Sequence, residues 1–281
     1  MRKRYPSDLS DEQWHSLQQL LPPAKRGGRP RTVDLREVVN TLFYQARTGV
    51  QWDYLPHDLV PKSTAWDYFV AWQKDGTWQK LVDALRGQVR RQQGRAETPS
   101  AACIDTQSVK TSEMGGPVGY DGNKKVKGRK RHIVVDTLGL LMAVAVTTAN
   151  RDDGTHAPAV LGKLDRDKFP RLRVIFGDNK YHNRTLDRWL QRTRAAYRVE
   201  VSSRPQGTTG FKPLKVRWVA EQALACLGRC RRLNRDHEYI LRHSEAWVQI
   251  AAIQRMVRRL RPNEEHPQPA FKYPKKEAKV A

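Results

Sequence analysis

The sequence predicts an α/β protein in which a sheet domain with flanking helices follows a small all-helical domain. Before position 92, apolar residues recur at helical spacing, whereas after position 100 they gather in short β-branched runs bounded by turns. A polar, basic stretch, RGQVRRQQGRAETPS at 86–100, separates the two patterns. We therefore expect a helical domain at 1–92, a hinge at 93–99, a sheet domain at 100–261 and a basic, disordered tail at 262–281.

Charge indicates the class of partner. The 281 residues include 52 Lys and Arg against 29 Asp and Glu, a formal net charge of +23. Such an excess indicates binding to a polyanion, most often nucleic acid. A purely structural nucleic-acid-binding protein, such as a ribosomal one, fits the charge as well.

Other features of the composition favour the cytoplasm. Cys103, Cys226 and Cys230 are odd in number and fit no zinc spacing, which favours a reducing compartment. The start, MRKRYPSDLSD, lacks the apolar stretch of a signal peptide. No run of about 18 apolar residues predicts a membrane span. We expect no membrane partner.

Helix signals open the chain. Capping boxes at Ser10/Gln13 and Asp34/Glu37 begin two helices, and a third is expected from Ser63 or Thr64. Two such helices in a basic protein resemble a helix-turn-helix, although the segment that joins them is longer than usual. Five tryptophans precede position 80, and we expect them to close a small core rather than to stack on bases: Trp14, Trp52, Trp66, Trp72 and Trp78.

The segment KRGGRPR at 25–31 offers two interpretations. Its Gly-Arg-Pro centre suits a narrow minor groove, where Arg29 and Arg31 would be favoured electrostatically. A solvated linker explains the same composition equally well.

Two acids interrupt or end predicted strands. Asp105 lies in the middle of the apolar run AACIDTQSVKT (101–111), where a core strand would place Val or Ile. Burying a charge is costly unless it is paired or binds a metal. Alone, Asp105 is more simply explained as a turn-capping residue. Asp178, however, is a second acid in a comparable setting. It follows the strand RVIF (173–176), at the strand end where α/β sheets commonly bind ligands.

A cluster of cations follows the first of these strands. Six of the eight residues from 124 to 131 are basic, and they lead into an apolar strand at 133–135. A hairpin that contacts phosphates is the preferred interpretation, and an ordinary solvated surface is the alternative. The six cations are Lys124, Lys125, Lys127, Arg129, Lys130 and Arg131.

The remaining elements complete the sheet domain. A strand at 140–148 forms an antiparallel meander with the two before it. Helices are expected at 156–164 and 185–194, a strand at 197–202, and helices at 217–233 and 244–260. On the helix at 217–233, the period predicts Arg217, Glu221, Gly228 and Arg232 on one face. That face suits a phosphate backbone, and an i,i+4 ion pair between Arg217 and Glu221 is the plainer alternative.

Asp105, Asp178 and Glu221 together suggest a reaction class. Carboxylates suit Mg²⁺ or Mn²⁺, and three that converge could hold two ions about 4 Å apart for phosphodiester chemistry. No His or Cys cluster offers a zinc site and no Gly-Lys-Thr loop offers a nucleotide site. Metal-assisted phosphoryl transfer therefore uses most of the chain's features. Ser108 as a nucleophile lacks a base at suitable spacing.

These motifs resemble those of the DDE transposases, in particular the insertion sequence 5 family. The resemblance rests on CIDTQSVKT around Asp105, GYDGNKKVKGRKRHIVVDTLG, VIFGDNKY around Asp178 and RWVAEQALACLGRCRRLNRDHE around Glu221. YPSDLSDEQW, GVQWDYLP and STAWDYF are similar to that family's DNA-binding region. The resemblance covers nearly all of the chain up to about residue 260.

The resemblance implies a ribonuclease-H-like mixed sheet preceded by a helix-turn-helix-like domain. It also implies two-metal cleavage at terminal inverted repeats and transfer of the 3′ ends into target DNA, with Asp105, Asp178 and Glu221 as metal ligands. The family's signature around the Glu is matched by Arg217 and Glu221, whereas Leu214 replaces its Tyr and Gly228 its basic residue. Arg229 and Arg232 are the substitutes we expect to contact DNA.

By the same resemblance, the partner is double-stranded DNA, bound by a homodimer or higher oligomer associated with the nucleoid. Two alternatives stay open. One is a non-catalytic repressor that uses the helical half alone, and the other is a nuclease that cuts without joining.

Overall fold

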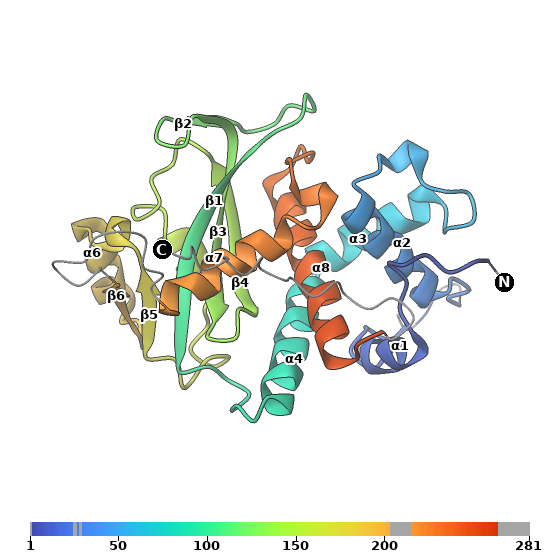
Figure 1. Ribbon diagram of the computed structural model, residues 1–281, viewed down its shortest axis with the longest axis horizontal. Coiled ribbons are helices and arrows are strands. Elements are labelled where there is room, and N and C mark those ends of the chain that lie inside the picture. Colours follow the sequence, from blue (N-terminus) through green and yellow to red (C-terminus); the bar gives the residue numbers. More distant parts are fainter. Residues whose placement is uncertain (1, 25–26, 28–29, 203–214, 264–281) are drawn as a thin grey trace, which may run out of the picture.

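The computed structural model describes residues 2–24, 27, 30–202 and 215–263, with the backbone alone at 215–217. The helical part contains α1 (Asp11–Gln18), α2 (Leu35–Thr48), the 3-10 turn η1 (Trp52–Tyr54), α3 (Lys62–Lys74) and α4 (Thr77–Gln92) (Figure 1). Both predicted helix starts are confirmed, and Ser10 and Gln13 form the expected capping box. At the second start, the Asp34 side chain accepts from Arg36 N, whereas Glu37 pairs with Arg2. Gly49, at φ 72°, ends α2 as predicted.

The second part is a mixed sheet with short helices. Its strands are β1 (Ala101–Lys110), β2 (Gly119–Asp121), β3 (Val126–Asp136), β4 (Leu141–Thr148), β5 (Val174–Gly177) and β6 (Arg198–Val201). Strand β3 pairs antiparallel with β1, β2 and β4, which confirms the meander, whereas β5 lies parallel between β1 and β6. The short strand β2 was not predicted, because it lies within a Gly-rich loop.

Six helical segments accompany the sheet. They are α5 (Pro158–Leu161), η2 (Asn179–Tyr181), α6 (Arg184–Thr193), α7 (Lys215–Leu227) with η3 (Arg231–Leu233), and α8 (Leu241–Leu260). The predicted helix at 217–233 is wrong after residue 227. The α-helix ends at Leu227, directly before Gly228, which has a low helix propensity. No helix among the described residues is long and apolar enough to cross a membrane.

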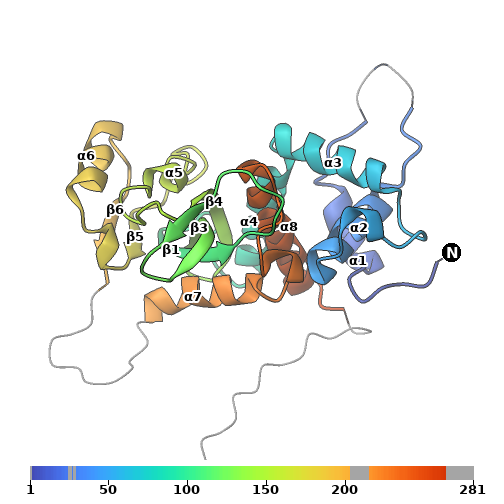
Figure 2. The ribbon, with the colours of Figure 1, turned by 90° about the horizontal axis from the view of Figure 1, so that it is seen from above.

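Helices cover both faces of the sheet (Figure 2). Cys103, Ile133 and Val135 point into a core that they share with α7, α8 and α1 to α4. Ala102, Ile104 and the other alternate residues point into a second core with α5, α6 and Tyr181. Because side chains alternate along a strand, each sheet residue can be assigned to one face. The faces are called here the α7 face and the α5 face.

The helical part and the α7 face of the sheet share one hydrophobic core. Helix α8 packs against α1, α2, α3, α4 and β4, so C-terminal residues complete the N-terminal bundle. Trp72 and Trp78 are buried there, as predicted, and the three other early tryptophans are partly buried against the same core. The expected division at 93–99 therefore does not separate two cores. That segment also folds back onto α4, where Arg90 Nε donates to Ala96 O at 2.7 Å, rather than forming a free hinge.

Candidate active site

Asp105 and Asp178 are brought side by side by strand register. Strand β1 pairs in parallel with β5, and the pairing aligns Ala101 with Val174 and Cys103 with Phe176. Two residues further along each strand stand Asp105 and Asp178, the latter just past the end of β5 in extended conformation. Neighbouring strands lie about 4.8 Å apart. The fold thus places these half-buried acids next to each other.

By alternation along their strands, Asp105 and Asp178 both belong to the α7 face. Asp105 alternates with Cys103, whose side chain joins the core under α7, and Asp178 alternates with Phe176, which packs against that core. The Asp105 carboxylate accepts from Thr106 N at 2.7 Å, and that of Asp178 from Lys180 N at 3.0 Å.

Glu221 reaches the same face from α7. Ala220, Ala223 and Leu224 bury one side of this helix on the sheet. Val219 faces the β3–β4 turn, since its Cγ1 lies 3.5 Å from where a Cβ on Gly139 would stand. At roughly 100° per residue, Glu221 lies on the opposite flank of α7 from Val219. The turn is at the amino end of β1, where Asp136 pairs with Ala102, so Glu221 faces toward the carboxyl ends of β1 and β5. Its side chain is exposed.

Tyr181 lies near the two strand acids, on the other face of the sheet. Its ring is buried against the α5 face, and a Cβ on Gly177 would stand 2.5 Å from that ring. Burial raises the pKa of the Tyr181 phenol well above its usual value, and Asp105, Asp153 and Asp178 raise it further. Tyr181 therefore lies within the electrostatic range of both strand acids.

The acids are gathered on one face but do not form a closed metal cage. Among the described residues, no three His, Cys, Asp or Glu side chains stand close enough together to hold an ion. Asp105 and Asp178 offer two adjacent hard oxygen donors, and Mg²⁺ is commonly held by one or two carboxylates together with water and substrate phosphates. The donor set thus suits a divalent ion that binds with its substrate, with Glu221 at the rim.

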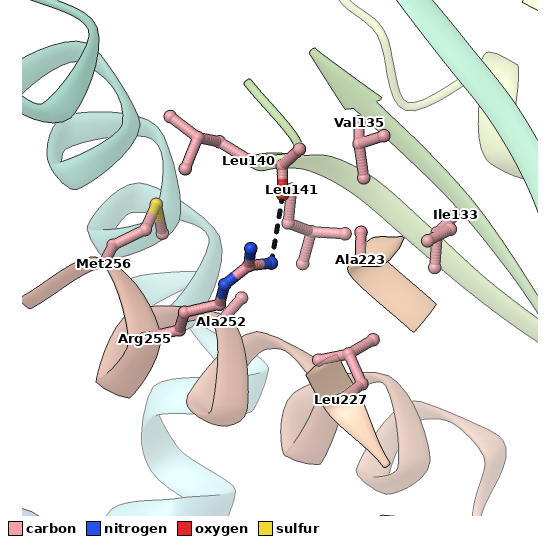
Figure 3. A pocket seen from close by; sticks show the side chains of 10 residues that line it. Ile133, Val135, Leu140, Leu141, Ala223, Leu227, Ala252, Arg255 and Met256 are labelled. Carbon is pink, nitrogen blue, oxygen red and sulfur yellow. Dashed lines mark hydrogen bonds between the residues drawn. The ribbon is translucent and has the colours of Figure 1, made fainter. Parts of the chain in front are cut away.

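The apolar hollow beside α7 is not a ligand site. It lies under the β3–β4 turn, has a volume of about 20 Å³ and is lined by Ile133, Val135, Leu140, Leu227 and other apolar residues (Figure 3). Arg255 Nη1 closes one side by donating to Gly139 O at 3.4 Å. A space of that size holds little more than one water molecule.

The predicted phosphate-contacting hairpin is wrong for three of its six cations. Strand β3 begins at Val126, so four of the six cations lie within a strand in the middle of the sheet. Arg129, Lys130 and Arg131 are buried there, with 0, 4 and 1% of their surface exposed. Arg129 pairs with Asp236, and Arg131 Nη1 donates to Leu233 O at 2.8 Å. DNA cannot reach these side chains in this conformation.

Gly128 explains why the basic run can enter the sheet. A Cβ at this position would stand 1.9 Å from Val109 O on β1, so only glycine allows the two strands to approach this closely. The other three cations, Lys124, Lys125 and Lys127, are exposed. Lys124 Nζ donates to Thr106 O at 3.1 Å, directly beside Asp105.

The remaining predicted DNA contacts differ in their placement. Arg232 is buried, ion-paired with Glu238 and stacked 5.2 Å from the Trp247 ring, so its assignment to the Glu221 face is wrong because the helix ends first. Arg229 is exposed at the end of α7. Arg31 is exposed and donates to Pro23 O at 3.1 Å. Arg29 and the side chain of Arg217 lie outside the described residues.

His132, on the α5 face of β3, is expected to make the protein sensitive to acid. It is fully buried, and burial lowers its pKa to about 4. The unfolded chain binds the proton near pH 6.5, so unfolding takes up a proton between about pH 6.5 and 4. This part of the stability is present above that window and is lost as the pH falls, by about 3 kcal/mol. Urea unfolding measured across this range should show the loss in the wild type.

The His132→Gln variant should have a flatter pH dependence, whereas His57→Gln, at an exposed histidine, should follow the wild type. Equal slopes for the wild type and His132→Gln between pH 6.5 and 4 would contradict this assignment.

Sequence comparisons identify the family. A family described as "Putative transposase of IS4/5 family" matches residues 9–82, and one described as "Transposase DDE domain" matches residues 96–255. The chain is also similar to the insertion element IS402 uncharacterized 16.2 kDa protein of Burkholderia cepacia, with 27% identity over 117 residues, which is 40% of this chain and 78% of that protein. No solved structure matches the chain. Since the DDE domain alone spans more than half of the sequence, the chain belongs to the DDE transposases of the IS4/5 family.

Proposed function

We propose that this chain cleaves DNA at the terminal inverted repeats of an insertion element and joins the 3′ ends to target DNA. Its sheet domain would act as a ribonuclease-H-like catalytic domain. One observation carries the proposal: the register of β1 and β5 aligns Asp105 with Asp178 on the face that α7 covers. Two in-register carboxylates would be a costly arrangement for stability alone, because like charges repel at this spacing.

The donor chemistry fits two Mg²⁺ or Mn²⁺ ions held by Asp105, Asp178 and Glu221. When bound, such ions activate an attacking hydroxyl and stabilise the leaving oxygen of a phosphodiester. The chain's own part is to hold the acids. The strands fix Asp105 and Asp178, and α7 offers Glu221 from the flank, so that bound DNA would bring the third carboxylate to the other two.

Exposed cations around this face would hold the DNA backbone. Lys124 lies next to β1 at Thr106, and Lys125 and Lys127 follow it. Arg229 is exposed two residues after the end of α7, and Arg31 is exposed in the helical part. We assign recognition of the element's terminal repeats to the helical part. The double-stranded DNA would be bound by a dimer or a larger assembly. Affinity for DNA should fall steeply with salt, because several phosphates are neutralised.

The test uses purified full-length protein, labelled terminal-repeat DNA and Mg²⁺. Asp105→Asn, Asp178→Asn and Glu221→Gln should each reduce cleavage by more than the roughly 10- to 100-fold that loss of an outer-shell partner costs. DNA binding should be retained in all three, since none of these acids attracts phosphate.

Unchanged cleavage in all three variants would overturn the proposal. Cleavage by the wild type with no joined products would leave a nuclease in its place. Specific binding of the terminal repeats with no cleavage in Mg²⁺ or Mn²⁺ would leave a repressor.

A further inference from the structure

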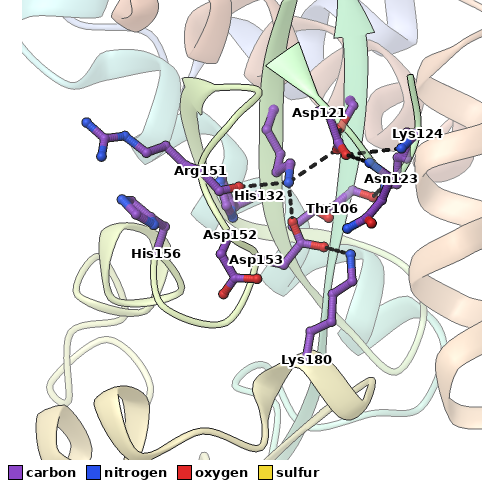
Figure 4. A network of polar contacts seen from close by, with 12 residues as sticks. Thr106, Asp121, Asn123, Lys124, His132, Arg151, Asp152, Asp153, His156 and Lys180 are labelled. Atoms are coloured by element: carbon purple, nitrogen blue, oxygen red, sulfur yellow. Dashed lines mark hydrogen bonds and ion pairs between the residues drawn. The ribbon is translucent and has the colours of Figure 1, made fainter. Parts of the chain in front are cut away.

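Four buried or half-buried charges connect the Asp178 segment to the centre of the sheet (Figure 4). Lys130, on β3, points to the α5 face, where its Nζ lies 2.6 Å from Asp153 Oδ1 and 3.3 Å from Asp121 Oδ2. The other oxygen of Asp153 accepts from Lys180 Nζ at 2.9 Å. Asp153 therefore bridges two lysines, one on the rigid central strand and one in the turn η2.

Lys180 lies two residues after Asp178 and is hydrogen-bonded to it. Its backbone N–H donates to Asp178 Oδ1 at 3.0 Å, and the Tyr181 N–H donates to the Asp178 carbonyl at 3.0 Å. Any displacement of Lys180 would therefore turn the Asp178 carboxylate. The side chain of Lys180 thus ties the orientation of Asp178 to β3.

The backbone of the Asp153 turn is in direct contact with the same segment. A Cβ on Gly154 would stand 1.9 Å from Lys180 O and 2.3 Å from Asn183 Nδ2. Nothing larger than glycine fits between the two turns. Asn183 in turn caps α6 by accepting from Leu186 N at 2.9 Å. The contact at Gly154 and the ion pair at Asp153 are independent constraints on one short segment.

Electrostatics favour the charged form of Asp153. Burial alone would raise the pKa of Asp153, but its hydrogen bonds with Lys130 and Lys180 outweigh burial and lower it. Asp153 is therefore ionised at neutral pH, and its contact with Lys180 Nζ at 2.9 Å is an ion pair. With only 5% of the Asp153 side chain exposed, salt screens this pair little.

We propose that Asp153, acting through Lys180, is a positioning residue that holds the Asp178 carboxylate in the orientation in which it can bind a divalent ion. The inference rests on the proposed function, in which Asp178 is a metal ligand. Outer-shell partners of this kind typically change metal affinity or activity by 10- to 100-fold. Neither Asp153 nor Lys180 is assigned a contact with DNA or with the reacting atoms.

Asp121 provides a matched control. It is buried to the same degree as Asp153 and contacts the same Lys130, but the described residues that it contacts do not include Lys180. Asp121→Asn and Asp153→Asn therefore each remove one buried carboxylate charge from Lys130. Only Asp153→Asn loosens Lys180 and with it Asp178.

The experiment measures Mn²⁺ binding by full-length protein on terminal-repeat DNA, using the electron paramagnetic resonance signal of the free ion and the same DNA without protein as the blank. Asp153→Asn is expected to raise the Kd for Mn²⁺ by about 10-fold or more, while Asp121→Asn leaves it within about twofold at a comparable melting temperature. A Kd for Asp153→Asn equal to that of Asp121→Asn would overturn the inference.

Substitutions at the half-exposed Lys180 keep the test decisive if Asp153→Asn fails to fold. Lys180→Met should weaken Mn²⁺ binding and cleavage, and Lys180→Arg, which can still pair with Asp153, should restore most of both. Equal losses in Lys180→Arg and Lys180→Met would reject the ion pair as the cause.

Asp178→Asn separates this inference from the proposed function. If Asp178→Asn leaves both Mn²⁺ binding and cleavage intact, the proposed metal site is wrong and the positioning role falls with it. If Asp178→Asn abolishes both while Asp153→Asn and Lys180→Met change neither, only the positioning role is wrong.

Discussion

A chain that ends at residue 240, directly before α8, is expected not to fold in either half. Helix α8 buries seven large apolar side chains, and no other described element contacts both the helical part and the sheet so widely. At about 1.5–3 kcal/mol for each such side chain, their burial is comparable to the whole net stability of a domain, about 5–15 kcal/mol. These side chains are Trp247, Val248, Ile250, Ile253, Met256, Val257 and Leu260.

The contacts of α8 show why both halves should fail together. The Trp247 ring stacks on Phe69 at 4.9 Å and lies 6.1 Å from Trp52, so it fills the centre of the helical part. On the other side, Glu245 Oε1 accepts from Val146 N on β4 at 3.0 Å. Gln249 donates to Gln79 on α4, which donates in turn to Met142 O on β4.

Circular dichroism and limited proteolysis of the two truncated chains check this prediction. A chain that ends at residue 261, which keeps α8 whole, should unfold cooperatively near the temperature of the full protein, whereas the chain that ends at residue 240 should show no cooperative transition. A folded, protease-resistant helical part in the shorter chain would contradict the single shared core. For the same reason, removal of residues 1–90 is not expected to leave a folded catalytic half.

The positions of the two strand acids were predictable because a charge within an apolar run is rare and costly. Asp105 and Asp178 both interrupt or end such runs, and the strands around them form as expected. Their mutual register was not predictable, since it depends on parallel pairing between segments separated by more than 60 residues. The same holds for the ion pair between Asp153 and Lys180, for which the sequence carries no local signal.

The main errors arose where the charge pattern and the burial pattern differ. Lysine and arginine are usually exposed, so a basic run predicts a surface. Strand β3 is central, however, and its alternation sends Arg129 and Arg131 to one covered face and Lys130 to the other. Acids from distant segments neutralise Arg129 and Lys130, whereas Arg131 donates to Gln107 and to the carbonyl of Leu233. The predicted helix extended beyond the end of α7, because the helical spacing of apolar residues continues past Gly228 although the α-helix ends at Leu227.

Replacement of Arg129 by Met is expected to destabilise the protein by about 3–5 kcal/mol, the usual cost of leaving one partner of a buried ion pair alone. The guanidinium is completely buried and donates to Asp236 at 2.8 Å, to Ser244 at 3.1 Å and to the carbonyls of Pro117 and Tyr239. Asp236 is also buried, and its backbone bonds to Lys110 and Ser112. Loss of Arg129 therefore leaves a buried carboxylate without its cation and frees the loop after β1.

Lys127 is the matched control, because it lies on the same strand and is exposed. Urea unfolding should show a change within about 0.5 kcal/mol for Lys127→Met. DNA binding, measured at low temperature where both variants are folded, should be affected by Lys127→Met and not by Arg129→Met. Lys127→Met should reduce the slope of log K against log salt by about 0.9, the contribution of one phosphate contact. Arg129→Met should leave that slope unchanged. A stable Arg129→Met variant with a reduced slope would return Arg129 to the DNA surface and contradict its role inside the sheet.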